Sequence, residues 1–74
     1  MKFRKPDFGN RNLELRFENE VVCIYGTVAG LKRLGELCNR LIENPAQGHI
    51  HLEDAPNFLT DESEKGAIAI FEGK

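Results

Sequence analysis

The sequence lacks several features that identify common classes of small protein. It has no tryptophan and one tyrosine, and its two cysteines, Cys23 and Cys38, do not form a CxxC pair. With no further cysteines, a disulfide framework is excluded. Both thiols are therefore expected to be reduced and to act as small buried hydrophobic side chains. Such use of cysteine is typical of a cytoplasmic protein.

Long apolar runs and an excess of positive charge are also missing. No stretch approaches the roughly 18 consecutive apolar residues of a membrane-spanning helix. Residues 1–12 form a basic N-terminal segment without an apolar core, so no signal peptide is expected there. The net charge of −2 argues against a partner bound through its phosphates. These absences exclude membrane and nucleic-acid partners from the prediction.

The usual signatures of catalysis are absent as well. Ser63 is the only serine, and it does not lie in a GxSxG motif. Both cysteines lie in apolar patterns, where a thiol is inert. Residues 26–30, GTVAG, lack the spacing of either phosphate-binding fingerprint. The sequence therefore predicts a non-enzymatic protein without a cofactor.

The length and composition indicate one small folded domain. The 74 residues are 41% hydrophobic and 30% charged, a balance found in globular domains and not in disordered chains. A chain of this size buries only about 60% of the surface that it exposes when unfolded. Small domains are often supported by oligomerisation for this reason.

The first half of the chain begins with two candidate strands. Residues 13–18, LELRFE, alternate between apolar and charged side chains, which is typical of a half-buried strand. Asn19 and Glu20 favour a tight turn. Residues 21–26, VVCIYG, are rich in β-branched side chains and apolar on both faces. We expect a β-hairpin whose second strand is covered more fully than its first.

A helix is expected after this hairpin. Thr27 is a suitable N-cap, because its hydroxyl oxygen can accept from an N–H of the first helical turn. Leucines then recur with a helical period, and charged side chains occupy the opposite face. Pro45 predicts the end of the helix. Gly35 lies in the apolar stripe, where glycine costs up to about 1 kcal/mol relative to alanine, so we expect the helix to approach the sheet closely there.

Two further strands follow the helix. Residues 49–53, HIHLE, alternate, with both histidines and Glu53 on one face. Residues 66–72, GAIAIFE, form the last candidate strand. The loop between them, residues 54–65, is long for so small a domain, which is typical of a functional segment. Phe58 and Leu59 are expected to anchor it.

These elements predict a two-layer α+β domain over residues 13–74, with the order ββαββ. One amphipathic helix covers one face of a four-stranded sheet. The second face carries polar and apolar side chains, among them Glu14 and Arg16. An open mixed face on a small domain favours an interaction surface, with an ordinary solvated face as the alternative. Its apolar side chains and the small core also favour a homodimer.

The histidine pair is the most specific chemical feature. His49 and His51 point the same way from a strand, with Cα atoms about 6.6 Å apart, and could share one metal ion. A zinc site needs further ligands, and Glu53 lies about 13 Å from His49 by the same rise. A surface that contacts a protein partner is therefore favoured, with the acidic loop beside it attracting a basic partner. The predicted contact residues are His49, His51, Glu53, Asp54, Asp61 and Glu62.

Three stretches together resemble a known family: residues 26–43, residues 48–54, GHIHLED, and residues 59–71, LTDESEKGAIAIF. They resemble the Imm32-type immunity proteins of bacterial polymorphic toxin systems. The positions that carry the resemblance are Gly26, Gly30, Leu31, Leu34, His49, His51, Leu59, Ser63, Ile68 and Ile70. The resemblance extends over roughly residues 13–72.

This resemblance implies a small cytoplasmic protein that binds and neutralises a cognate toxin and is not an enzyme. Two alternatives from the residues alone stay open. One is a small metal-binding protein that uses the His-x-His strand, and the other is a structural homodimer.

Overall fold

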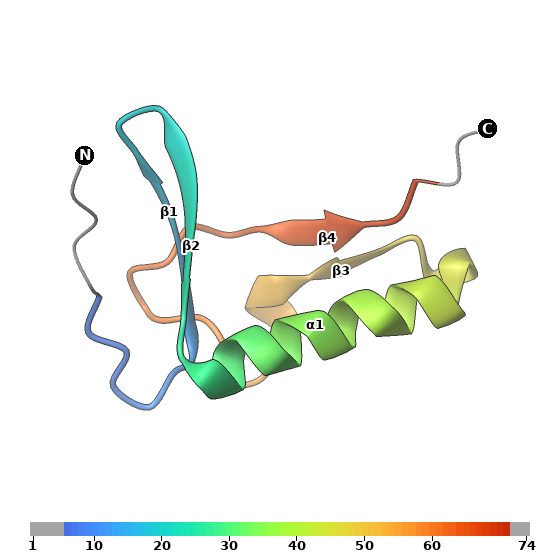
Figure 1. Ribbon diagram of the computed structural model, residues 1–74, viewed down its shortest axis with the longest axis horizontal. Coiled ribbons are helices and arrows are strands. Elements are labelled where there is room, and N and C mark those ends of the chain that lie inside the picture. The colour runs from blue at the N-terminus through green and yellow to red at the C-terminus, as the bar shows by residue number, and fades with distance from the viewer. Residues whose placement is uncertain (1–5, 72–74) are drawn as a thin grey trace.

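The computed structural model of the chain describes residues 6–71 (Figure 1). Residues 1–5 of the basic segment, and residue 72 of the last expected strand, lie outside the described residues. The elements are β1 (Leu13–Glu18), β2 (Val21–Gly26), α1 (Val28–Glu43), β3 (His49–His51) and β4 (Ala67–Ala69), with short 3-10 helices at Pro45–Gln47 and Leu52–Asp54. The α+β class and the order ββαββ are confirmed.

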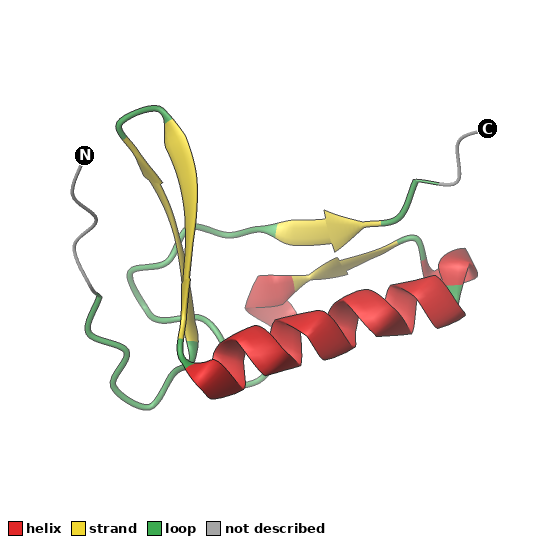
Figure 2. Ribbon diagram, viewed as in Figure 1, coloured by secondary structure: helices red, strands yellow, loops and turns green. Residues whose placement is uncertain are grey.

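The single four-stranded sheet that the sequence predicts is wrong. Among the strands of residues 6–71, β1 pairs with β2 and β3 pairs with β4, as two separate antiparallel sheets. Figure 2 shows the β1–β2 hairpin standing across the N-terminal end of α1, while β3 and β4 run along the helix. The helix therefore contacts two small sheets and not one continuous layer.

The reason for the division lies at the second edge of β1. The Leu13 N–H donates to the Phe58 carbonyl at 3.0 Å, and the Thr60 N–H donates to the Leu13 carbonyl at 3.0 Å. Further along, the Glu64 N–H donates to the Leu15 carbonyl at 2.8 Å. Residues 58–64 thus occupy the edge of β1 that a third strand would need.

The same segment reverses the expected burial of the hairpin. Leu13 and Leu15 of β1 are 0% and 8% exposed, whereas Val22 and Ile24 of β2 are 72% and 53% exposed. The expectation that the second strand is the better covered one is wrong. The apolar composition of β2 reflects an uncovered face of the hairpin, because residues 58–64 pack along β1 and leave β2 at the rim.

Local signals along the first half of the chain are confirmed. Asn19 and Glu20 have φ of +51° and +64°, as a type I′ hairpin turn requires. The Thr27 hydroxyl accepts from the Gly30 N–H at 3.0 Å and caps α1. The helix ends at Glu43, two residues before Pro45.

The expected close approach of the helix occurs at a different glycine. A Cβ at Gly30 would lie 2.0 Å from the backbone oxygen of Asn12, so only glycine fits there. Around Gly35, by contrast, a Cβ would have no described atom within 4 Å. The prediction for Gly35 is wrong, because the first turn of α1, and not its middle, contacts the chain before β1.

A small core joins the two sheets and the helix. Its buried members are Leu13, Leu15, Leu37, Leu52 and Phe58. Leu59 packs against them, which confirms the anchoring role of Phe58 and Leu59. Cys23 is buried as expected, but Cys38 is exposed, because its side of α1 faces away from the core.

Replacing Leu37 by alanine tests this core. Leu37 is 6% exposed, so the substitution should lower the free energy of unfolding by roughly 2–5 kcal/mol. Glu36→Ala, at an exposed neighbouring position, should change it by about 0.5 kcal/mol or less. Thermal melting followed by circular dichroism compares the two, and equal melting temperatures would contradict the assigned helix face.

Candidate functional site

The predicted contact residues line three pockets, and the one that Glu53 and Asp54 line shares residues with each of the other two. Asp61 and Glu62 line a cleft beside β1. His49, His51 and Asp54 line a separate pocket beside α1. That these six residues form one contact surface stays a prediction.

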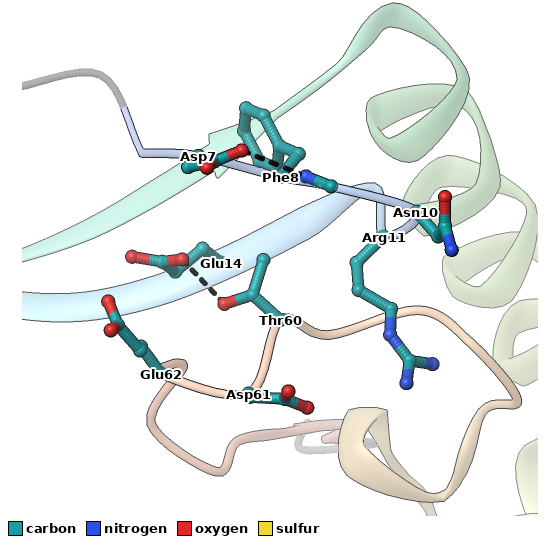
Figure 3. A pocket seen from close by; sticks show the side chains of 9 residues that line it. Asp7, Phe8, Asn10, Arg11, Glu14, Thr60, Asp61 and Glu62 are labelled. Carbon is teal, nitrogen blue, oxygen red and sulfur yellow. Dashed lines mark hydrogen bonds between the residues drawn. The ribbon is translucent and has the colours of Figure 1, made fainter.

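The cleft beside β1 is acidic (Figure 3). It has a volume of about 400 Å³ and lies between residues 7–11, β1 and residues 60–62. Its acidic lining residues are Asp7, Glu14, Asp61 and Glu62. The basic residue of its lining, Arg11, donates to the Asn57 side-chain oxygen at 2.7 Å. The lining as a whole thus presents an excess of negative charge.

Glu14 is the member of the cleft that sequence reasoning misplaced. The alternation of β1 predicts an open face for it, but the side chain is buried, at 1% exposure. Its carboxylate accepts from the Thr60 hydroxyl and from Arg16 Nε. These bonds satisfy a buried charge that would otherwise be costly. No local signal reveals this burial, because Thr60 is remote in sequence.

The Glu14 contact continues into a network on the polar face of the hairpin. Arg16 Nη1 lies 3.2 Å from Glu18 Oε2, and the Tyr25 hydroxyl donates to Glu18 Oε1 at 2.8 Å. The hydrogen bond to Glu14 raises the pKa of Arg16. Partial burial, then the hydrogen bond to Glu18, raises the pKa of Tyr25 to about 12. The wall of the cleft is therefore held by side chains from both strands.

The pocket beside α1 that His49 and His51 line, which we call the histidine surface, differs from the acidic cleft because it carries charges of both signs. His49 and His51 are exposed, with ring centroids 4.9 Å apart in an edge-to-face arrangement. Their pocket has a volume of about 350 Å³ and also contains Arg33 and Arg40 of α1. Charges of both signs meet there, since Asp54 lines the same pocket.

Glu53 does not continue the strand as expected. β3 ends at His51, and the 3-10 helix Leu52–Asp54 turns the Glu53 side chain back. Its carboxylate lies 3.2 Å from His51 Nδ1 and accepts from the Gly66 N–H at 3.2 Å. Its own backbone N–H, then the Gly66 N–H and the charge of His51, lower the pKa of Glu53 despite desolvation. Glu53 thus positions His51 and ties the loop to the start of β4.

Two structural findings concern a metal site and a membrane-crossing helix. Within residues 6–71, no group of three or more histidine, cysteine, aspartate or glutamate side chains is arranged to hold a metal ion. The histidine pair accordingly has no third protein ligand within the described part of one chain. No helix in the same part of the chain has the length and apolar character needed to cross a membrane.

The network around Tyr25 predicts a specific pH dependence. Tyr25 is the only tyrosine and tryptophan is absent, so phenolate absorbance reports this residue alone. The titration should have its midpoint near pH 12, and Glu18→Gln should lower that midpoint. Because the folded pKa exceeds the unfolded value of 10.0, the contribution of Tyr25 to stability is present below pH 10 and is lost as pH rises toward 12. A midpoint near 10 in the folded wild-type protein would contradict the network.

Comparison with known proteins adds one match. The family model of immunity protein 32 matches residues 21–72, which include β2, α1 and the second sheet. No curated protein and no solved structure matches the chain. The matched region covers most of the chain and contains the histidine strand and the acidic loop. The chain therefore belongs to the immunity protein 32 family.

Proposed function

We propose that this protein acts in the cytoplasm as an immunity protein, where it binds a cognate bacterial toxin directly and neutralises it without catalysing a reaction. Membership of the immunity protein 32 family supports a toxin as partner. The observation that carries the proposal is the acidic cleft, with Asp61 and Glu62 exposed at its edge.

The loop that carries these carboxylates is held on both sides. Before them, the Thr60 N–H donates to the Leu13 carbonyl at 3.0 Å. After them, the Ser63 hydroxyl accepts from the Leu15 N–H at 2.8 Å. Only Asp61 and Glu62 project between these anchors. A preorganised loop loses little conformational entropy on binding, which favours its use as a recognition surface.

The charge of the cleft indicates the chemistry of the partner. The Glu14 carboxylate is satisfied by Thr60 and Arg16, so an incoming group meets the exposed carboxylates of Asp61 and Glu62. Lysine or arginine side chains of the toxin are the complementary groups. Such complementarity mainly raises the association rate, and salt weakens it.

The histidine surface is proposed as a second, weaker contact. His49, His51 and Asp54 are exposed, and a neutral imidazole can both donate and accept a hydrogen bond. Glu53 contributes through its contact with His51. Because charges of both signs meet here, this surface is expected to add specificity more than attraction.

The test measures binding to the proposed cognate toxin. The double variant Asp61→Lys/Glu62→Lys should lose affinity by about tenfold or more, mostly through slower association at low salt. The control Glu36→Lys/Glu43→Lys changes the charge equally at exposed positions of α1 and should bind like the wild type. His49→Ala/His51→Ala should weaken binding less than the loop variant does.

Three outcomes would contradict the proposal. Folded wild-type protein could fail to bind that toxin or to protect cells that express it. The loop variant could bind as tightly as the α1 control, which would remove the cleft from the interface. A large drop in melting temperature on adding EDTA would instead favour the metal-binding alternative.

A further inference from the structure

Helix α1 has two apolar stripes, and the described chain covers only one of them. The covered stripe consists of Gly30, Leu34, Leu37 and Leu41; Leu37 belongs to the core and Leu34 packs against it, while Gly30 and Leu41 are buried. One residue further round the helix, a second stripe consists of Leu31, Gly35, Cys38 and Ile42. Leu31 and Ile42 are 50% and 64% exposed. An amphipathic helix on a monomer normally has a single such stripe.

The uncovered stripe adjoins an apolar groove. The groove has a volume of about 740 Å³ and lies between the hairpin, α1 and β4. Phe17, Val22 and Ile24 form its hairpin wall, and each is more than half exposed. The core residues Leu15 and Leu52 also line it, so the groove opens onto the core. Obligate interfaces resemble a domain core cut in half in this way.

No contact within residues 6–71 explains the glycine at position 35. It costs about 1 kcal/mol relative to alanine in a helix interior, yet no described atom approaches the position of its Cβ. The stripe is nearly symmetric about it, with Leu31 and Cys38 on either side and Val28 and Ile42 beyond. An antiparallel copy of the same stripe would therefore bring like side chains together, with the glycines at the crossing.

We propose that this surface binds a second copy of the chain. In the resulting two-fold dimer, α1 packs antiparallel against the partner's α1, and the helices cross at Gly35. Leu31 of each chain lies against Cys38 of the other, and the apolar hairpin wall covers the far end of the partner helix. The arrangement is isologous, as is usual for small homodimers.

A stable dimer would bury a substantial part of the surface of so small a chain. A standard interface buries about 800 Å² per partner. This is about a seventh of the 5591 Å² that the chain exposes. Six large apolar side chains that are at least half exposed lie on this surface, namely Phe17, Val22, Ile24, Val28, Leu31 and Ile42.

Charge favours a second copy here and not in the acidic cleft. The groove includes Arg16, Glu64 and Lys65, so charges of both signs are present and two copies do not repel each other. The cleft with Asp61 and Glu62 shares no lining residue with the groove. A dimer thus leaves the cleft open, and it does not depend on the identity of the toxin.

The experiment measures the mass of the full chain by light scattering at micromolar concentration. The wild type should show twice the chain mass of 8.4 kDa. Gly35→Glu should show the mass of one chain with unchanged helical circular dichroism, since no described atom lies within 4 Å of that position. Ala29→Glu adds the same charge at an exposed position on the polar side of α1 and should remain a dimer.

A second variant covers the case in which Gly35→Glu fails to fold. Val22→Glu changes a side chain that is 72% exposed in the hairpin wall, so it should also give the mass of one folded chain. A wild type with the mass of one chain would overturn the proposal. So would a folded Gly35→Glu or Val22→Glu variant that keeps the mass of two chains.

Discussion

The docking of residues 58–64 along the outer edge of β1 is the contact on which the rest of the structure depends. Phe58 is fully buried, and its carbonyl accepts from the backbone N–H groups of Asn12 and Leu13. Leu13 and Leu59 form a parallel bridge, and Thr60 binds the buried Glu14 carboxylate. Through these contacts a loop remote in sequence becomes part of the hairpin. Without them the β1–β2 hairpin would have little to attach it to the second sheet.

This one contact also shapes the two surfaces for which we propose the main binding events, the acidic cleft and the apolar groove. On one side it holds Asp61 and Glu62 at the rim of an acidic cleft. On the other side, residues 58–64 occupy the free edge of β1, so β2 remains at the rim with Val22 and Ile24 uncovered. The first surface is charged and suits a basic partner that arrives by diffusion. The second is apolar and opens onto the core, which suits a copy of the same chain. The two binding events that we propose can therefore occur together.

The elements that the sequence predicts correctly are those set by near neighbours. Alternation defines β1, the tight turn lies at Asn19 and Glu20, and Thr27 and Pro45 bracket α1 within two residues. The errors arise where a residue depends on a distant one. Glu14 is buried because Thr60 passes over it, and Glu53 leaves its strand to bind Gly66. For the same reason the sequence could propose six candidate contact residues by type, but it could not show which pockets they line.

The most direct measurement for the central claim is backbone hydrogen exchange of the wild-type protein with and without its cognate toxin. Toxin binding at the acidic cleft should slow exchange in residues 7–11 and 58–64, with a smaller effect at β3. The uncovered stripe of α1 should exchange equally in both samples, because a second copy and not the toxin covers it. Protection confined to α1 and β2, with none in residues 58–64, would contradict the account.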